Sequence, residues 1–175
     1  MRSKKSSMEI VETDDLYQTK NDIPEDKRTE LIKILNKRLA DAIDLQLQMK
    51  QAHWNVKGPA FIALHELFDK IYGAVESYVD LIAERAVQLG GVAEGTARIS
   101  ASRSELAEYP LTLNDGPSHV DAVSSALADF GKEVRLAILD ADELEDADTA
   151  DIFTEISRGI DKWLWFVEAH AQSVK

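Results

Sequence analysis

The sequence predicts an all-α protein in which four long helices form a bundle with one long crossover connection. Apolar residues recur at every third or fourth position through most of the chain, which is the period of an amphipathic helix. No segment shows the polar and apolar alternation of a half-buried β-strand. A length of 175 residues suits a single domain, and we expect that domain to cover residues 23–175.

The first helix is expected to begin at Pro24, because proline suits the first turn and the acidic Glu25 and Asp26 suit the positive end of the helix dipole. Residues 1–22 are polar and mixed in charge, and we interpret them as a flexible tail. The segment ELIKILNKRLADAIDLQLQMKQAHWNV predicts a helix of about thirty residues. Gly58 and Pro59 are expected to end it.

A second helix is predicted over residues 60–89, where one narrow stripe is apolar. At about 100° per residue, the stripe residues fall within about 80° of one another. They are Leu64, Phe68, Ile71, Val75, Val79, Ile82, Ala86 and Leu89. The two glycines at 90–91 are expected to end this helix.

The second half of the chain is expected to contain two further long helices, over 117–139 and 149–172. Pro117 and Ser118 open the first of them. Residues 92–116 form a connection too long for a tight hairpin, which favours a crossover, and TARISAS within it is compatible with a short helix. Four long helices with a crossover between the second and the third describe a ferritin-like bundle.

The charge balance and composition restrict the partners of this chain. The net charge is −12, so the surface as a whole repels nucleic acid and anionic membranes and attracts cations. There is no cysteine, which excludes disulfides and thiolate metal sites. No apolar run approaches the roughly 20 residues that span a bilayer, and the N-terminus lacks the apolar region of a secretory signal. We therefore expect a cytoplasmic protein that does not bind membranes.

Two pairs of candidate metal ligands lie on the second helix. His65 and Asp69 are four residues apart, and so are Asp80 and Glu84, so each pair can share one helix face. At about 100° per residue, all four lie within an arc of about 100° beside the apolar stripe. The alternative interpretation is that they are ordinary charged and polar residues that flank the core, because such pairs are common on helices.

The two pairs are too far apart for one ion. Asp69 and Asp80 are separated by about 16 Å along the helix at about 1.5 Å per residue, whereas metal–ligand distances are about 2 Å. If two copies of the helix pack antiparallel about a two-fold axis, the His65 end of one copy meets the Glu84 end of the other, and two equivalent sites result. His53, near the end of the first helix, can reach the His65 end. Carboxylate and imidazole together suit iron, manganese or zinc.

At these residues the sequence closely resembles the Dps family, the DNA-binding proteins from starved cells or mini-ferritins. The resemblance rests on KQAHWNVKGPAFIALHELFD and YVDLIAERAVQLGG, and it continues in LYQTKND and DTADIFTEISRGIDKWLWFVEAH. It covers most of the chain from about residue 16. The Glu-x-x-His pattern of the usual ferritin-like di-iron bundle is absent from this sequence, which favours the mini-ferritin interpretation.

The resemblance implies a specific function. Family members assemble into hollow dodecamers, oxidise Fe(II) with hydrogen peroxide in preference to oxygen, and store the ferric product inside, which protects DNA from oxidative damage. Their ferroxidase centre lies at a two-fold interface. Carried over residue by residue, its five ligands are His53, His65, Asp69, Asp80 and Glu84.

Each of the three tryptophans can be interpreted as a packing residue. Trp54 follows His53 directly, and it is either an interface aromatic or, by the resemblance, a residue near the iron centre that quenches stray oxidising equivalents. Trp163 and Trp165 are interpreted as core or interface packing.

The acidic segment DADELEDADTAD, residues 140–151, contains seven carboxylates and no basic residue. It is either a solvated loop followed by a helix start, or an iron-entry pore, because the resemblance implies acidic channels near the start of the fourth helix at a three-fold axis. Three copies would concentrate Fe(II). The candidate pore residues are Asp146, Asp148 and Asp151.

DNA binding is the alternative function. Arg2, Lys4 and Lys5 make the first eight residues basic, although four acidic residues follow. Twelve such tails on a dodecamer would bind DNA multivalently and in a salt-dependent way. Some family members bind DNA through basic tails and others do not. A metal buffer that does not consume peroxide is a third possibility.

Overall fold

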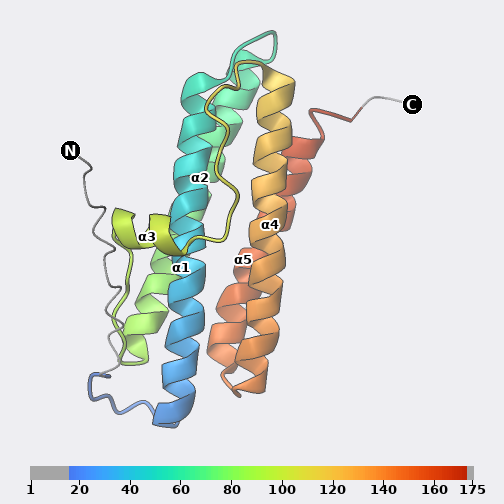
Figure 1. Cartoon of the computed structure of the whole chain (residues 1–175). Helices are drawn as coiled ribbons and strands as arrows, with labels where there is room; N and C mark the ends of the chain where they lie inside the picture. Colours follow the sequence, from blue (N-terminus) through green and yellow to red (C-terminus); the bar gives the residue numbers. More distant parts are fainter. Residues whose placement is uncertain (1–15, 173–175) are drawn as a thin grey trace, which may run out of the picture.

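The computed structural model describes residues 16–172, most of which belong to five α-helices (Figure 1). The helices are α1 (Glu25–Asn55), α2 (Phe61–Gln88), α3 (Ala97–Arg103), α4 (Gly116–Glu143) and α5 (Ala147–Glu168). No strand occurs between residues 16 and 172, so the all-α fold expected from the sequence is confirmed.

The four long helices form two antiparallel pairs, α1 with α2 and α4 with α5 (Figure 1). Contacts of α1 with α4 and of α2 with α5 join the pairs into one bundle. The start of α4 lies at the opposite end of the bundle from the end of α2, so the connection between them travels along the bundle and carries α3 against α1 (Figure 1). This connection is the predicted crossover.

Local chemistry explains where the helices begin. The side chain of Asp115 accepts a hydrogen bond from the backbone N–H of Ser118 at 2.9 Å and so caps the start of α4. Asp146 caps α5 in the same way through the N–H of Thr149 at 3.3 Å. Between α1 and α2, Gly58 adopts a φ of 110°, a left-handed conformation that favours glycine and allows the chain to turn back.

The core lies along the predicted apolar stripe of α2 and the facing sides of the other helices. Leu64, Phe68, Ile71, Val75, Ile82, Ala86 and Leu89 are buried, and Val79 is partly buried against the same core. Polar residues cover the opposite faces, and no helix within residues 16–172 is long and apolar enough to cross a membrane.

Two helix boundaries differ from the prediction. The helix expected over 117–139 continues as α4 to Glu143, because the acidic residues 140–143 contain no helix breaker. The turn falls instead at Leu144–Asp146, where Glu145 adopts a φ of 61°. The last helix ends at Glu168, earlier than the expected residue 172.

Leu16 and Tyr17 contact the bundle, although the sequence suggested a flexible tail over residues 1–22. The backbone N–H of Tyr17 donates to the carbonyl of Gly90 at 2.8 Å, and Leu16 packs against the core. The buried Arg28 bonds to the carbonyl of Leu89 at 2.8 Å beside this contact. Residues 1–15, with the basic Arg2, Lys4 and Lys5, lie outside the described residues.

Candidate metal centre

His53 and His65 lie together where the end of α1 faces the beginning of α2. The Nδ1 atom of His53 bonds to the carbonyl of His65 at 2.8 Å, and the Nδ1 atom of His65 bonds to the carbonyl of His53 at 2.9 Å. Their rings stack with centroids 3.7 Å apart. A carbonyl oxygen only accepts, so each Nδ1 donates to the carbonyl of the other histidine, and each Nε2 is left as the ring atom available to a metal ion.

The short turn between α1 and α2 produces this arrangement. The N–H of Phe61 donates to the carbonyl of Gly58 at 3.0 Å, which closes the turn. The ring of Phe61 also lies 5.0 Å from that of His65. The two histidines are twelve residues apart in sequence, yet this turn makes them neighbours.

Asp69 lies one helical turn beyond His65, and a lysine from α1 holds its carboxylate. Lys50 donates a hydrogen bond to Oδ1 of Asp69, and the side chain of Asp69 is 49% exposed. This hydrogen bond, together with the charges of Lys50 and the two histidines, holds the pKa of Asp69 below its ordinary value. Asp69 is therefore ionised and able to bind a cation.

Asp80 and Glu84 lie further along α2 and are both exposed. Within residues 16–172, neither side chain makes a hydrogen bond or an ion pair. In the same part of the chain, no three histidine or acidic side chains come together as a metal-binding group. The five predicted ligands therefore fall into two separate groups, which we name the histidine half-site (His53, His65 and Asp69) and the acidic half-site (Asp80 and Glu84).

The tryptophans differ in exposure. The side chain of Trp54 is 67% exposed beside the histidine half-site, and it lines a groove between α1 and the crossover. Trp163 is partly buried against the core and packs edge-on against Phe166. Trp165 is 62% exposed on α5. The proposed quenching role of Trp54 remains a prediction.

The acidic segment contains one residue that is structural. Asp146 is only 3% exposed and accepts two hydrogen bonds from Arg85, at 2.7 and 2.9 Å, besides capping α5. Burial opposes ionisation of Asp146, but the bonds from Arg85 and Thr149 outweigh it and lower its pKa. The carboxylate of Asp146 therefore has a structural role, and its place in a pore stays a prediction. Asp148 and Asp151 are exposed and stay candidates.

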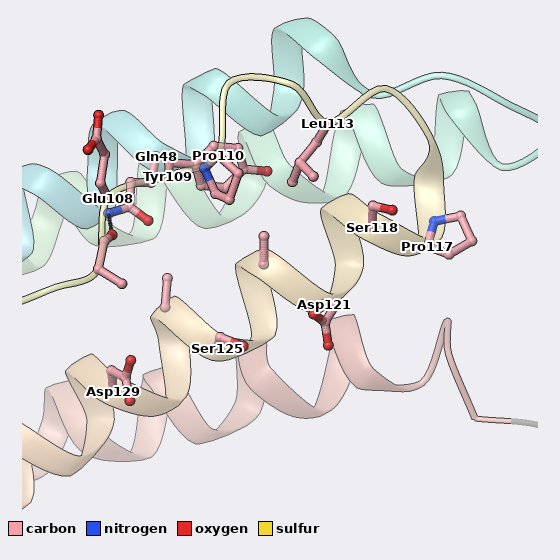
Figure 2. A pocket seen from close by; sticks show the side chains of 13 residues that line it. Gln48, Glu108, Tyr109, Pro110, Leu113, Pro117, Ser118, Asp121, Ser125 and Asp129 are labelled. Carbon is pink, nitrogen blue, oxygen red and sulfur yellow. Dashed lines mark hydrogen bonds between the residues drawn. The ribbon is translucent and has the colours of Figure 1, made fainter.

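A separate pocket of about 570 Å³ lies between the crossover and α4 (Figure 2). Glu108 lies on its crossover side and Asp121 on its α4 side, but no predicted ligand lines it. The hydroxyl of Tyr109, which lines the pocket, shares a hydrogen bond of 2.6 Å with Nδ1 of the buried His119. Burial lowers the pKa of His119, in spite of the nearby Asp115. This contact ties the crossover to the first turn of α4.

Sequence reasoning missed Lys50 and Arg85, which pair with the predicted site residues Asp69 and Asp146. Lys50 precedes His53 by three residues, so both lie on one face of α1, and this spacing was the available signal. Arg85 follows the predicted ligand Glu84, but its partner Asp146 is 61 residues away in the chain. No local pattern indicates that contact.

A helical bundle with one long crossover, carrying histidine and carboxylate pairs on its second long helix, defines a ferritin-like protein. A family model described as "Ferritin-like domain" matches residues 32–175. The chain belongs to the Dps family, whose curated members include proteins named DNA protection during starvation protein. The ferritin-like fold expected from the sequence is thereby confirmed.

Individual relatives support this assignment over nearly the whole chain. The chain is 47% identical over 156 residues to the DNA protection during starvation protein of Agrobacterium fabrum, covering 89% of this chain and 96% of that protein. It is 34% identical to the protein of the same name from Brevibacillus brevis, over 78% of this chain and 91% of that one. DpsA14 from Streptomyces coelicolor has a similar structure, with a TM-score of 0.86, 33% identity and coverage of 91% and 94% of the two chains.

Proposed function

We propose that this protein is a ferroxidase that oxidises Fe(II) at sites shared between two subunits and stores the ferric product in a hollow shell. The observation that carries the proposal is the histidine half-site. Two imidazoles whose Nδ1 atoms are already hydrogen-bonded leave their Nε2 atoms available near an ionised carboxylate, and the remaining carboxylates lie about 16 Å along the same helix. This separation of the ligands into two groups along α2 favours a site completed by a partner subunit.

In this proposal each residue has a defined role. The Nε2 atoms of His53 and His65 and a carboxylate oxygen of Asp69 bind Fe(II), and Asp80 and Glu84 of a second subunit complete the site. Imidazole and carboxylate suit iron in both oxidation states, because added carboxylate charge stabilises Fe(III). Two Fe(II) ions give up one electron each, and hydrogen peroxide takes both electrons and two protons to form two water molecules.

The assembly follows from the division of the site. An isologous contact between antiparallel α2 helices produces two equivalent centres per dimer. We propose that dimers assemble further into a dodecamer, as the family resemblance implies, and that the exposed Asp148 and Asp151 line an entry route for Fe(II). The net charge of −12 favours the accumulation of cations.

The test is Fe(II) oxidation by peroxide or by oxygen, followed optically, with the mass of the assembly measured on the same sample. His65→Ala and Glu84→Ala should each lower the rate at least about tenfold. The matched control is Glu155→Ala, which removes an exposed carboxylate from α5 and should leave the rate unchanged. Full activity in a verified monomer would overturn the shared site. Iron binding without peroxide consumption would indicate a metal buffer.

DNA binding is the second candidate function. It is favoured by the basic Arg2, Lys4 and Lys5 at the N-terminus of an otherwise acidic chain. The test is a gel shift at two salt concentrations with the full chain and with a chain that lacks residues 1–8. Binding that disappears in the shortened chain and weakens with salt would support the tail as the DNA-binding element.

A further inference from the structure

A positively charged side chain of the protein, Lys50, already occupies the histidine half-site. The ammonium group of Lys50 bonds to Oδ1 of Asp69 and lies 4.4 Å from the ring centroid of Tyr72. The Lys50 side chain is only 23% exposed, so it lies along the surface between α1 and α2. The acidic half-site differs, because Asp80 and Glu84 have no ion-pair partner within residues 16–172.

We propose that Lys50 is a displaceable counter-ion of Asp69, and that a divalent metal ion enters the histidine half-site by exchange with it. Lys50 thereby sets the metal affinity of this half-site. This inference rests on the proposed function, since it assumes that His53, His65 and Asp69 bind the metal.

The charges of the half-site support the exchange. The charges of Asp69 and Lys50 cancel in this ion pair, so the pair presents no net negative charge to an approaching cation. A metal ion that takes Oδ1 of Asp69 must break the hydrogen bond from Lys50, and it then lies close to a like charge. The ion pair is partly exposed, so its loss costs little and the exchange is reversible. Binding is therefore weaker than the three ligands alone would make it.

Tyr72 provides a place for the displaced ammonium group. A lysine over an aromatic face is attracted to the ring. Because Lys50 already lies over Tyr72 while it bonds to Asp69, a small movement releases the carboxylate and keeps the contact with the ring. Before the exchange the carboxylate of Asp69 competes with the ring for the ammonium group, whereas afterwards the ring is its remaining partner and attracts it more strongly. Tyr72 should therefore favour metal binding while Lys50 is present, and it should have no such effect without Lys50.

The experiment measures Co²⁺ binding to the assembled full-length protein from visible absorption, and it counts only the signal that His65→Ala abolishes. Lys50→Met and Lys50→Gln should each bind Co²⁺ about three- to fivefold more tightly than wild type, the equivalent of one partly exposed ion pair. Lys50→Arg should stay close to wild type. Lys70→Met is the matched control, because Lys70 is exposed and makes no ion pair within residues 16–172; it should change affinity less than twofold.

A double-mutant cycle tests the role of Tyr72. Tyr72→Leu should weaken Co²⁺ binding about twofold in the wild-type background and leave it unchanged in Lys50→Met. Equal affinities of wild type, Lys50→Met and Lys50→Gln would overturn the exchange and leave the proposed function intact. The absence of any histidine-dependent Co²⁺ signal in wild type and in all variants would instead overturn the metal site itself, and with it this inference.

Discussion

Removal of the Asp146 carboxylate should destabilise the fold strongly, whereas removal of the neighbouring Asp148 carboxylate should not. Asp146 is 3% exposed, and its partner Arg85 is 5% exposed. Asp146→Ala therefore leaves a buried guanidinium group without its carboxylate, which typically costs about 3–5 kcal/mol. It also removes the cap of α5, worth about 1 kcal/mol.

The expected loss is thus roughly 4–6 kcal/mol. For a chain of this size, that corresponds to a fall in Tm of roughly 10–20 °C. Asp148 has a side chain that is 84% exposed and lies 3.8 Å from Arg85, so Asp148→Asn should change stability by less than about 0.5 kcal/mol.

The assay is thermal and urea unfolding, followed by far-UV circular dichroism at one fixed protein concentration, because assembly couples stability to concentration. Arg85→Met together with Asp146→Leu removes both charges and should recover part of the stability that Asp146→Ala loses. An Asp146→Ala protein as stable as Asp148→Asn would refute the structural role of Asp146.

Three further predictions concern the shared site, iron entry and pH. Co-expressed His65→Ala and Glu84→Ala subunits, each nearly inactive alone, should regain about a quarter of wild-type ferroxidase activity, because half of randomly mixed dimers are heterodimers with one intact site of two; confirmed mixing without recovery would exclude an isologous site. Changing Asp148 and Asp151 to Asn should slow iron uptake at low Fe(II) and low ionic strength, and an unchanged uptake rate would remove them from the entry route. Burial lowers the pKa of His119 from 6.5, so the unfolded chain takes up a proton at a higher pH than the folded protein does. The contribution of neutral His119 to the free energy of unfolding should therefore be complete above that pH and decline as the pH falls below it. Urea unfolding at roughly pH 7.5 and 5.5 should show a larger loss for wild type than for His119→Gln; equal losses would contradict a buried, neutral His119.

Much of the fold could be predicted because helix periodicity is a local property. The apolar stripe from Leu64 to Leu89 indicated both the position of α2 and its buried face. The length of the connection before α4 predicted the crossover. The least reliable features were the boundaries, such as the end of α4, where an acidic run that resembles a loop continues the helix.

The sequence by itself also determined the candidate ligands and their separation along α2, because a helix converts residue spacing directly into distance. Only the tertiary structure decided how those residues are held. His53 and His65 stack because a turn closes between two helices. Lys50 pairs with Asp69, which is 19 residues away in the chain, and Arg85 pairs with the buried Asp146, which is 61 residues away. The physical reason is that contacts between helices depend on how their faces pack, and no spacing within one helix contains that information.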